Sequence, residues 1–257
     1  MKKLALTDFA KYRYPSALEL SPDSRYLTFA LKDVDREGDG YRWNLWLYDL
    51  ERRESRQITQ GDDQRKAVWE DNTHILYKTT EPDEALRARG FEEEWTVYHR
   101  LNVCTGEDRE AFPIPLSGAG LWKMDEGRYV FTGETHLDRP NLLELTGEAL
   151  EKELVRRQQT RGYKVLTELP LCENGVGMFN QTRNTLFLYL EAAGEYRRIT
   201  PEDYDVNHVN VRPGQVLFTA FPFRDVKPVT EGMYRWDAER NETETLITPD
   251  KYSIAYG

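Results

Sequence analysis

A two-strand pattern recurs along this chain: a short apolar strand, a tight charged turn, and a second strand that closes on an aliphatic residue and threonine. The first strands of these pairs end at Asp49, Asn102, Leu145, Leu190 and Asp237, so the steps between them are 53, 43, 45 and 47 residues. A repeat of roughly 40 to 50 residues is typical of a β-propeller, in which each repeat forms one four-stranded blade. The spacing therefore predicts an all-β fold of four-stranded blades.

The strands predict about five blades and the start of a sixth. A turn at 21–24 precedes the first blade, because Pro sets φ and Asp and Ser form local hydrogen bonds. The sixth blade would begin at 252–254. The main predicted strands of the five blades are 25–30, 44–50 and 55–59; 74–77 and 95–98; 129–131 and 141–145; 185–189 and 196–200; and 215–219 and 233–237.

One segment departs from the strand pattern. Residues 147–159 have Val155 as their one β-branched residue, and Leu150 and Leu154 stand at i and i+4. This composition and spacing predict a short helix inserted in a blade.

The chain ends one strand into the predicted sixth blade. An incomplete ring leaves strand edges unpaired, so we expect either that N-terminal strands complete this blade or, as the favoured alternative, that residues 1–257 are the N-terminal part of a longer protein. We also expect self-association through the exposed blade edges, or disorder near 252–257.

Composition excludes several classes of protein. With 39% hydrophobic and 12% aromatic residues the chain is too apolar for a disordered protein, and its net charge of −10 argues against a nucleic-acid binder. It has no apolar run of 18 residues, and Asp8 and Lys11 interrupt the start before a signal-peptide core can form. We therefore expect no membrane partner and a cytoplasmic location.

No metal or cofactor site is predicted. Cys104 and Cys172 have no second Cys or His at zinc-ligand spacing, and we interpret them as unpaired thiols. The four histidines fall in different repeats, and 175–177 is only half of a phosphate-binding fingerprint.

Several segments resemble the propeller of the prolyl-oligopeptidase group of serine peptidases, in its acylaminoacyl-peptidase branch. Residues 20–29 and 44–59 are similar to the first blade of that family, although many propellers share such strands. More specific are 168–179, where Pro and apolar residues lead into Asn-Gly-Val-Gly, and the following Arg-Asn-Thr-Leu-Phe-Leu-Tyr strand at 183–189. The resemblance implies further blades and a C-terminal α/β-hydrolase domain that carries Ser, Asp and His.

The chain itself has no nucleophile elbow. This turn requires Gly-x-Ser-x-Gly, and none of the six serines has both glycines. Leu116-Ser117-Gly118-Ala119-Gly120 comes nearest and is interpreted as a turn between blades. We therefore expect no catalytic residue in this chain and peptidase activity only in the parent that the resemblance implies.

An acidic triplet is the candidate for the substrate path. Related peptidases of the dipeptidyl branch hold the substrate's amino terminus with acidic propeller residues, which suggests this role for Glu92, Glu93 and Glu94 beside Arg89. A solvated charged loop is the simpler interpretation. A parent that takes acylated amino termini would also offer no ammonium group to bind.

Three hypotheses follow, in order of preference. The first is the access-controlling propeller of a serine oligopeptidase that removes N-acylated residues or short N-terminal fragments from peptides. The second is a free-standing propeller that binds a protein partner. The third is a propeller enzyme with carboxylates in its central channel, for which no repeated Asp or His gives support.

Overall fold

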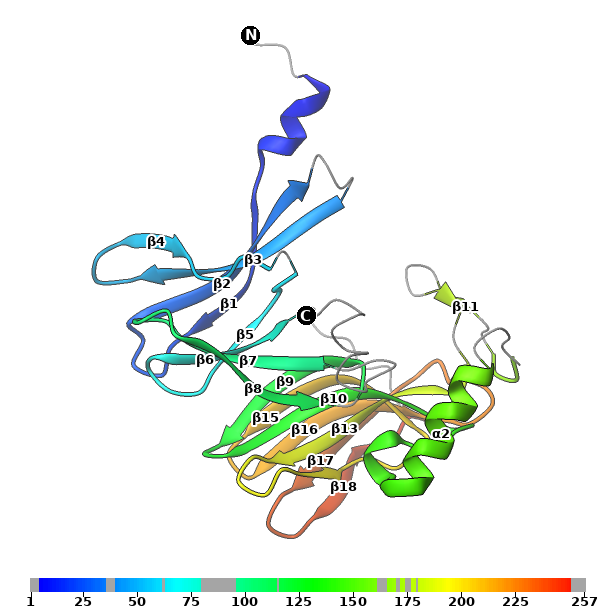
Figure 1. Ribbon diagram of the computed structural model, residues 1–257. Helices are drawn as coiled ribbons and strands as arrows, with labels where there is room; N and C mark the ends of the chain where they lie inside the picture. The colour runs from blue at the N-terminus through cyan, green and yellow to red at the C-terminus, as the bar shows by residue number, and fades with distance from the viewer. Residues whose placement is uncertain are drawn as a thin grey trace. The chain divides into compact units, whose positions relative to one another are not determined.

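The computed structural model describes residues 5–35, 40–61, 63–79, 96–114, 116–160, 166–169, 172–173, 177–178 and 180–250. These residues form four antiparallel sheets of four strands each, together with a two-stranded sheet. The chain consists of two compact units, Met1–Ile114 and Pro115–Gly257, and each unit contains two of the four-stranded sheets (Figure 1). The all-β repeat that the spacing predicts is therefore confirmed.

The first unit begins with the 3₁₀ helix η1 (Leu6–Lys11) and holds the first and second sheets, in which the strands pair in chain order. Ser21 and Ser24 close the first hairpin turn as expected, with the Ser24 N–H donating to the Ser21 carbonyl over 2.8 Å. The strands of the first sheet are Tyr14–Leu20 (β1), Tyr26–Asp35 (β2), Gly40–Asp49 (β3) and Glu54–Gln57 (β4). Those of the second sheet are Ala67–Trp69 (β5), His74–Thr79 (β6), Thr96–Asn102 (β7) and Asp108–Ile114 (β8).

The second unit holds the third and fourth sheets. The third sheet has the order β14-β13-β10-β9, and the fourth pairs in chain order from β15 to β18. Strands of the third sheet are Gly118–Asp125 (β9), Arg128–His136 (β10), Thr182–Leu190 (β13) and Glu195–Arg198 (β14). Strands of the fourth are Tyr204–Arg212 (β15), Gln215–Pro222 (β16), Gly232–Asp237 (β17) and Glu242–Ile247 (β18), and the two-stranded sheet joins Cys172–Glu173 (β11) to Gly177–Met178 (β12).

The blade count differs from the prediction, because the predicted third and fourth blades share one sheet. β10 pairs directly with β13, from Arg128 opposite Leu190 to His136 opposite Thr182. The apolar run at 141–145, read as a strand, instead contains the 3₁₀ turn η2 (Leu142–Glu144). Among the described residues, this run pairs with no strand, and it lies at the start of the segment inserted between β10 and β13. The predicted start of a sixth blade at 252–254 lies outside the described residues.

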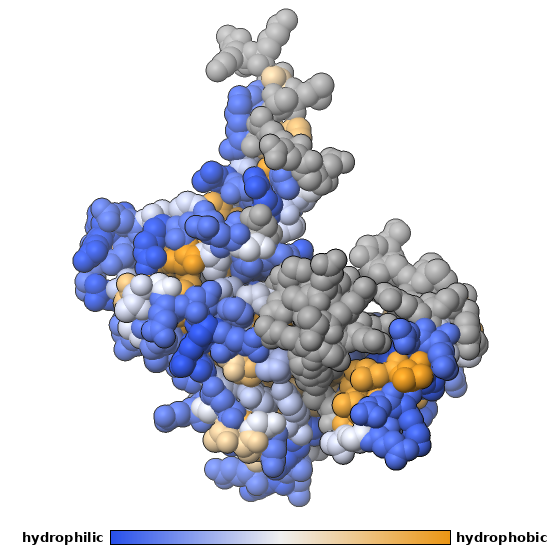
Figure 2. Space-filling view, viewed as in Figure 1, coloured by the Kyte–Doolittle hydropathy of each residue, from blue (hydrophilic) through white to orange (hydrophobic). Residues whose placement is uncertain are grey.

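The predicted helix is confirmed as α2 (Gly147–Thr160), inserted between β10 and β13. Figure 2 shows a mostly hydrophilic surface with an apolar area at the position of α2, where Val155 is 53% exposed. No helix among the described residues is long and apolar enough to cross a membrane.

The hairpin that ends each sheet has the same turn. In three of the four, an Asp or Asn ends the strand and its side-chain oxygen accepts two backbone N–H groups from the turn, as when Asp49 Oδ1 accepts from Glu51 and Arg52 at 3.0 Å each. In all four, the residue four positions after the strand end has positive φ. These residues are Arg53 (57°), Gly106 (78°), Gly194 (64°) and Asn241 (52°).

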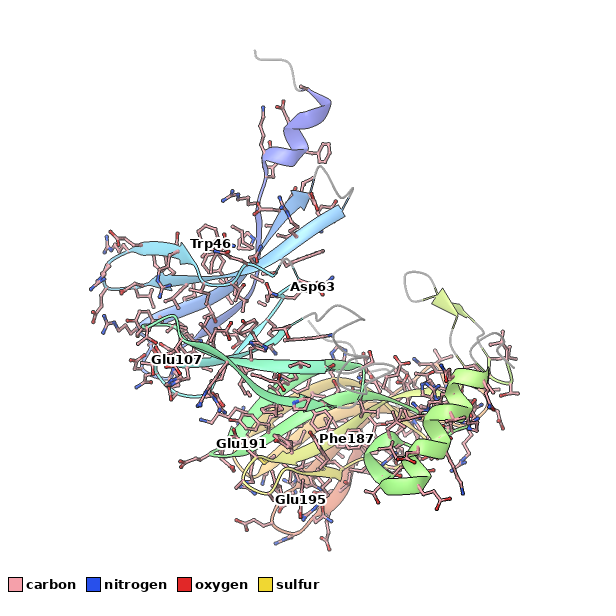
Figure 3. All side chains as sticks on the ribbon, viewed as in Figure 1. Trp46, Asp63, Glu107, Phe187, Glu191 and Glu195 are labelled. Atoms are coloured by element: carbon pink, nitrogen blue, oxygen red, sulfur yellow. The ribbon has the colours of Figure 1, made fainter. Side chains whose placement is uncertain are left out.

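A pair of ring side chains recurs at one position of each four-stranded sheet. One ring belongs to the third strand of the sheet in chain order and stands three residues before the end of that strand. The other ring belongs to the residue directly opposite on the second strand. Figure 3 labels Trp46 and Phe187, which are the third-strand members in the first and third sheets. The pairs, with their ring-centroid distances, are Phe29–Trp46 (6.4 Å), Tyr77–His99 (5.9 Å), Phe131–Phe187 (5.1 Å) and Phe218–Tyr234 (5.4 Å).

Each unit has its core between its two sheets. In the first unit, aliphatic side chains of β2 and β3 pack on the second sheet; in the second unit, aliphatic side chains of β10 and β13 pack on the fourth. A sheet stabilised in this way is the basic unit of a propeller, because a sheet buries its apolar face only against another element.

Candidate functional site

The sequence-predicted substrate-path residues Arg89, Glu92, Glu93 and Glu94 lie outside the described residues. Their role therefore stays a prediction.

The serine nearest to an elbow sequence stands between two strands. Ser117 is exposed and directly precedes β9, and its carbonyl accepts the Glu134 N–H over 3.0 Å. A nucleophile elbow requires a strained turn from a strand into a helix, whereas Ser117 leads into a strand. Its position between β8 and β9 agrees with the predicted connection between blades.

The histidines lie on or at the ends of strands and contact nearby polar groups. His74 Nδ1 lies 2.9 Å from Asp71 Oδ2, and His99 Nδ1 lies 3.1 Å from Asp108 Oδ1. Among the described residues there is no group of three or more His, Cys, Asp or Glu that could hold a metal ion.

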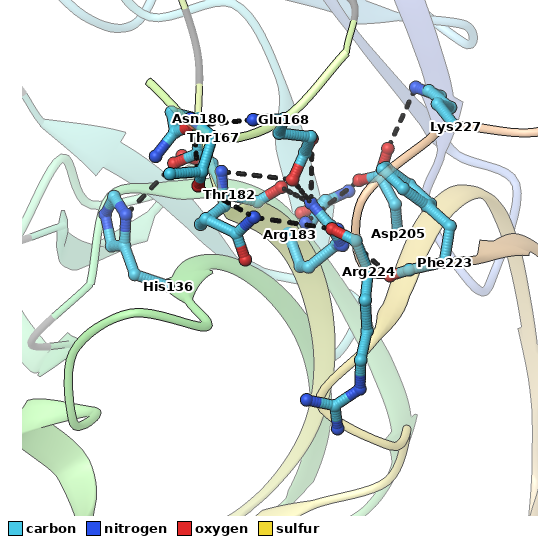
Figure 4. A network of polar contacts seen from close by, with 12 residues as sticks. His136, Thr167, Glu168, Asn180, Thr182, Arg183, Asp205, Phe223, Arg224 and Lys227 are labelled. Atoms are coloured by element: carbon cyan, nitrogen blue, oxygen red, sulfur yellow. Dashed lines mark hydrogen bonds and ion pairs between the residues drawn. The ribbon is translucent and has the colours of Figure 1, made fainter. Parts of the chain in front are cut away.

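The most elaborate polar cluster of the described residues lies in the second unit, where the inserted segment returns to β13 (Figure 4). Its centre is an ion pair between Glu168 and Arg183, whose side chains are both fully buried. Arg183 Nη1 donates to both carboxylate oxygens of Glu168, at 3.2 and 3.0 Å. Two buried charges are tolerated only when each is paired and hydrogen-bonded, so this arrangement depends on both residues.

Arg183 also reaches the connection between β16 and β17. Its Nη2 donates to the carbonyls of Phe223 (3.0 Å) and Arg224 (3.1 Å), and its guanidinium lies over the Phe223 ring at 3.6 Å. The planar guanidinium can donate in several directions at once, which a Lys ammonium on a flexible stem does less well. Arg183 therefore ties the end of the insertion to the edge of the fourth sheet.

Backbone hydrogen bonds reinforce this connection. Leu169 and Val226 form an isolated parallel bridge, in which the Leu169 N–H donates to the Asp225 carbonyl (3.0 Å) and the Lys227 N–H donates to the Leu169 carbonyl (3.2 Å). The Asn180 side-chain oxygen also accepts the N–H groups of 167 and 168, at 2.6 and 3.1 Å. The chain around Glu168 is thus held on two sides.

A second layer of charged groups lies beside the ion pair. Asp205 accepts from the Lys227 ammonium at 2.9 Å and from the Asn184 N–H at 3.1 Å. Between β15 and the residue before β17, the buried Glu231 accepts from the Asn207 amide at 3.1 Å. Each of these carboxylates has a donor within hydrogen-bonding distance, so the groups hold chain segments in place.

The helix at the start of the insertion is fastened by a different ion pair. Glu153 accepts from Arg156 (2.7 Å) and Arg157 (2.9 Å), and Arg157 in turn donates to the Pro140 carbonyl over 2.8 Å. The hydrogen bond from Arg156, followed by that from Arg157, lowers the pKa of Glu153 although burial acts to raise it. Glu153 therefore stays ionised and keeps α2 against the preceding turn.

The ion pairs and amides of the cluster position chain segments, and at its edge Thr182 Oγ1 lies 3.5 Å from His136 Nδ1 (Figure 4). Sequence reasoning did not identify Glu168 and Arg183 as partners, although both lie in the segments that carry the family resemblance. The observation that could have identified them is an Arg in a strand that is otherwise largely buried and apolar, since a buried charge needs a partner.

Comparison with known proteins gives a fold likeness. No protein-family model and no curated protein matches the chain. Acylaminoacyl peptidase from Pyrococcus horikoshii is similar in structure, with a TM-score of 0.63 and 12% sequence identity, over 94% of this chain and 33% of that one. An acylaminoacyl peptidase in complex with Z-Gly-Gly-Phe-chloromethyl ketone gives the same values.

TolB from Acinetobacter baumannii is more distant, with a TM-score of 0.51 and 11% identity over 91% of this chain and 43% of that one. The chain thus has a propeller fold of the kind found in acylaminoacyl peptidase, and it spans about a third of the length of that peptidase.

Proposed function

We propose that this chain is the propeller portion of a longer serine oligopeptidase similar to acylaminoacyl peptidase, in which it limits the peptides that reach the catalytic domain. The observation that carries the proposal is the structural likeness to one third of that peptidase over 94% of this chain. The resemblance of residues 168–189 to the same branch supports it independently of the fold.

The polar cluster supports a role in access control. An element that excludes large substrates must keep its position, because a mobile segment would yield to them. The insertion between β10 and β13 is held by the buried Glu168–Arg183 pair at its far end and by Glu153 near its start. Ionic and backbone contacts at both ends suit a fixed barrier better than a flexible loop.

The catalytic residues would lie in the rest of the polypeptide. The proposed partner of this chain is a C-terminal α/β-hydrolase domain, and the proposed substrates are short peptides with acylated amino termini. A Ser–His–Asp triad there would form an acyl-enzyme and release the acylated residue. The low cysteine content suits the cytoplasmic location that we propose for the whole enzyme.

The test is a serine-hydrolase assay on the complete product of the coding region. A fluorophosphonate probe should label this product, and acetyl-Ala-p-nitroanilide should be hydrolysed faster than Ala-p-nitroanilide. The 257-residue chain alone serves as the control and should show neither property. A product that takes no label contradicts the proposal and favours a free-standing protein-binding propeller.

Access control can be tested separately with the same complete product, by comparing substrates of different size. The value of kcat/KM should fall steeply when an acetylated peptide is lengthened or embedded in a folded protein. Equal rates on a short acetyl-peptide and on a folded acetylated protein would show that the propeller excludes nothing.

A further inference from the structure

The aliphatic face of the first sheet, which packs on the second sheet, ends in rings and cations. Ala30 and Leu45 lie opposite each other on β2 and β3, and both are fully buried in this core. Two residues further along both strands, Lys32 lies opposite Trp43. Side chains two residues apart share a face of a sheet, so Lys32 and Trp43 continue the aliphatic face. Both are only partly buried.

Two cations lie over the rings at this end of the face. The Lys32 ammonium lies 3.6 Å from the centroid of the Tyr41 ring and 5.2 Å from that of Trp43. The guanidinium carbon of Arg65 lies 4.2 Å from the Trp43 centroid, and the centroids of the two rings are 5.9 Å apart. The ring quadrupoles attract both cations and hold them in place. We call Lys32, Tyr41, Trp43 and Arg65 the cation–ring cluster.

The segment that carries Arg65 is fixed to β3. Asp63 forms a parallel bridge with Trp43, and the Gln64 N–H donates to the Trp43 carbonyl over 2.9 Å. The buried Gln64 side chain also accepts the Gly61 N–H at 3.0 Å. Asp63, labelled in Figure 3, accepts from Arg65 Nε at 2.8 Å and orients the guanidinium. The cluster is therefore pre-organised, which reduces the entropy lost when a ligand binds.

The cluster has more positive than negative charge, although the chain as a whole has a net charge of −10. Among the described residues, no carboxylate contacts the Lys32 ammonium, and Arg65 has Asp63 as its one acidic partner. The Arg65 side chain is 63% exposed and Tyr41 is 50% exposed, so the surface is open to solvent. Two cations beside one carboxylate can receive a second carboxylate from a ligand.

The ligand that fits this surface has a carboxylate and an apolar side chain close together. The carboxylate would accept charge-assisted hydrogen bonds from Lys32 and Arg65. The side chain would pack on the rings, to which Tyr14 adds another, since it lies opposite Lys32 on β1 and is 52% exposed. The C-terminal residue of a peptide has both groups. Nucleic acid fits less well, because its binding requires clustered cations in greater number.

We infer that the cation–ring cluster binds the free C-terminal residue of a short peptide. The inference rests on the proposed function, in which the substrates have acylated amino termini, so that the carboxylate is the one charged terminus by which they can be recognised. It adds to that function a surface that selects peptides by their C-terminal end.

The experiment measures peptide binding to the 257-residue chain by isothermal titration calorimetry. Acetyl-Ala-Ala-Phe is compared with acetyl-Ala-Ala-Phe-amide, which has the same side chains without the carboxylate. Lys32→Gln and Arg65→Gln each remove one cation of the cluster. The matched control is Arg42→Gln, since Arg42 is exposed and stands between Tyr41 and Trp43 on β3, hence on the opposite face. Thermal unfolding of each variant checks that the first sheet is intact.

We expect the acid to bind at least about tenfold more tightly than the amide, because the amide cannot accept charge-assisted hydrogen bonds. Lys32→Gln and Arg65→Gln should each weaken binding of the acid by about tenfold and leave the amide unchanged, whereas Arg42→Gln should change neither. Equal affinity for acid and amide, binding of neither at millimolar concentration, or equal effects of the three substitutions would overturn the inference.

Two further ligands distinguish the sources of negative charge. Acetyl-Ala-Glu-Phe-amide has its carboxylate in a side chain, and a short oligothymidylate has phosphates. If either bound as tightly as acetyl-Ala-Ala-Phe and lost affinity in Lys32→Gln, the assignment to a peptide C-terminus would be wrong. Absence of fluorophosphonate labelling in the complete product contradicts the peptidase proposal alone, since this binding measurement requires no catalytic domain.

Discussion

The last hairpin of each sheet and the insertion of the third sheet are held by different kinds of interaction. The hairpins use local backbone geometry, with an Asp or Asn side chain accepting N–H groups two and three residues ahead in three of the four. The insertion depends on a buried ion pair between residues 15 apart in sequence, and on carbonyls 40 residues away. The repeats are thus encoded within a few residues, whereas the insertion takes its position from the tertiary structure.

The largest effect should come from breaking the buried ion pair. Glu168→Gln leaves the Arg183 guanidinium buried without its counter-charge, and we expect a loss of about 3–5 kcal/mol in the free energy of unfolding. Arg183→Met should cost a similar amount. Urea denaturation followed by tryptophan fluorescence measures both changes.

A matched control for this prediction joins the turn η2 to β14 of the same sheet. Glu144 and Arg198 form an ion pair at 3.1 Å whose carboxylate side chain is 54% exposed. Glu144→Gln should change the free energy of unfolding by less than about 1 kcal/mol, since solvent screens exposed pairs. Equal losses in the free energy of unfolding at the two pairs would show that burial does not determine how much an ion pair stabilises this protein.

A smaller loss of stability is expected when the threonine that follows the last strand of a sheet is replaced. Thr59 Oγ1 accepts the Leu45 N–H at 2.8 Å, and Thr200 Oγ1 accepts the Leu186 N–H at 3.1 Å. Thr200→Val keeps the shape but leaves a buried N–H without an acceptor, at a cost of about 1–3 kcal/mol. Thermal unfolding should show this loss, and the exposed Thr245→Val should not. Loss of the same size at both positions would refute the role of the hydroxyl group.

The turn geometry predicts effects of opposite sign in two hairpins. Arg53 has φ of 57° and Gly194 has φ of 64° at the same position of the turn. Because an L-residue with a side chain is strained in this region, Arg53→Gly should stabilise by up to about 1 kcal/mol and Gly194→Ala should destabilise by about 1 kcal/mol. Differential scanning calorimetry checks both signs. If both variants changed the stability in the same direction, the two hairpins would not share this turn geometry.

The smallest effect concerns pH. Burial acts to raise the pKa of Asp71, but the N–H of Thr73 and the side chain and N–H of His74 together lower it to about 2. Since the unfolded value is about 4, the stabilisation is present above pH 4 and is lost as the pH falls towards 2. Asp71→Ala should therefore lower the unfolding temperature slightly at pH 7 and not at pH 2. A difference that stays constant over this range would exclude the ionised form as its source.

The sequence predicts the repeating sheets well, because strand alternation and turn residues act over a few positions. The helix at Gly147–Thr160 is predicted for the same reason. The blade count is wrong because 141–145 has the composition of a strand, and only the pairing of β10 with β13 shows that the insertion interrupts one sheet. The Glu168–Arg183 pair was not predicted, since nothing in either residue alone specifies its partner.

The most direct test of the account is to read the coding sequence beyond the codon for Gly257. If the proposed function is right, an in-frame continuation encodes further strands of the same repeat and then Gly-x-Ser-x-Gly, with Asp and His after it. A stop codon at that point, or a continuation without this elbow, would contradict the assignment to a serine oligopeptidase.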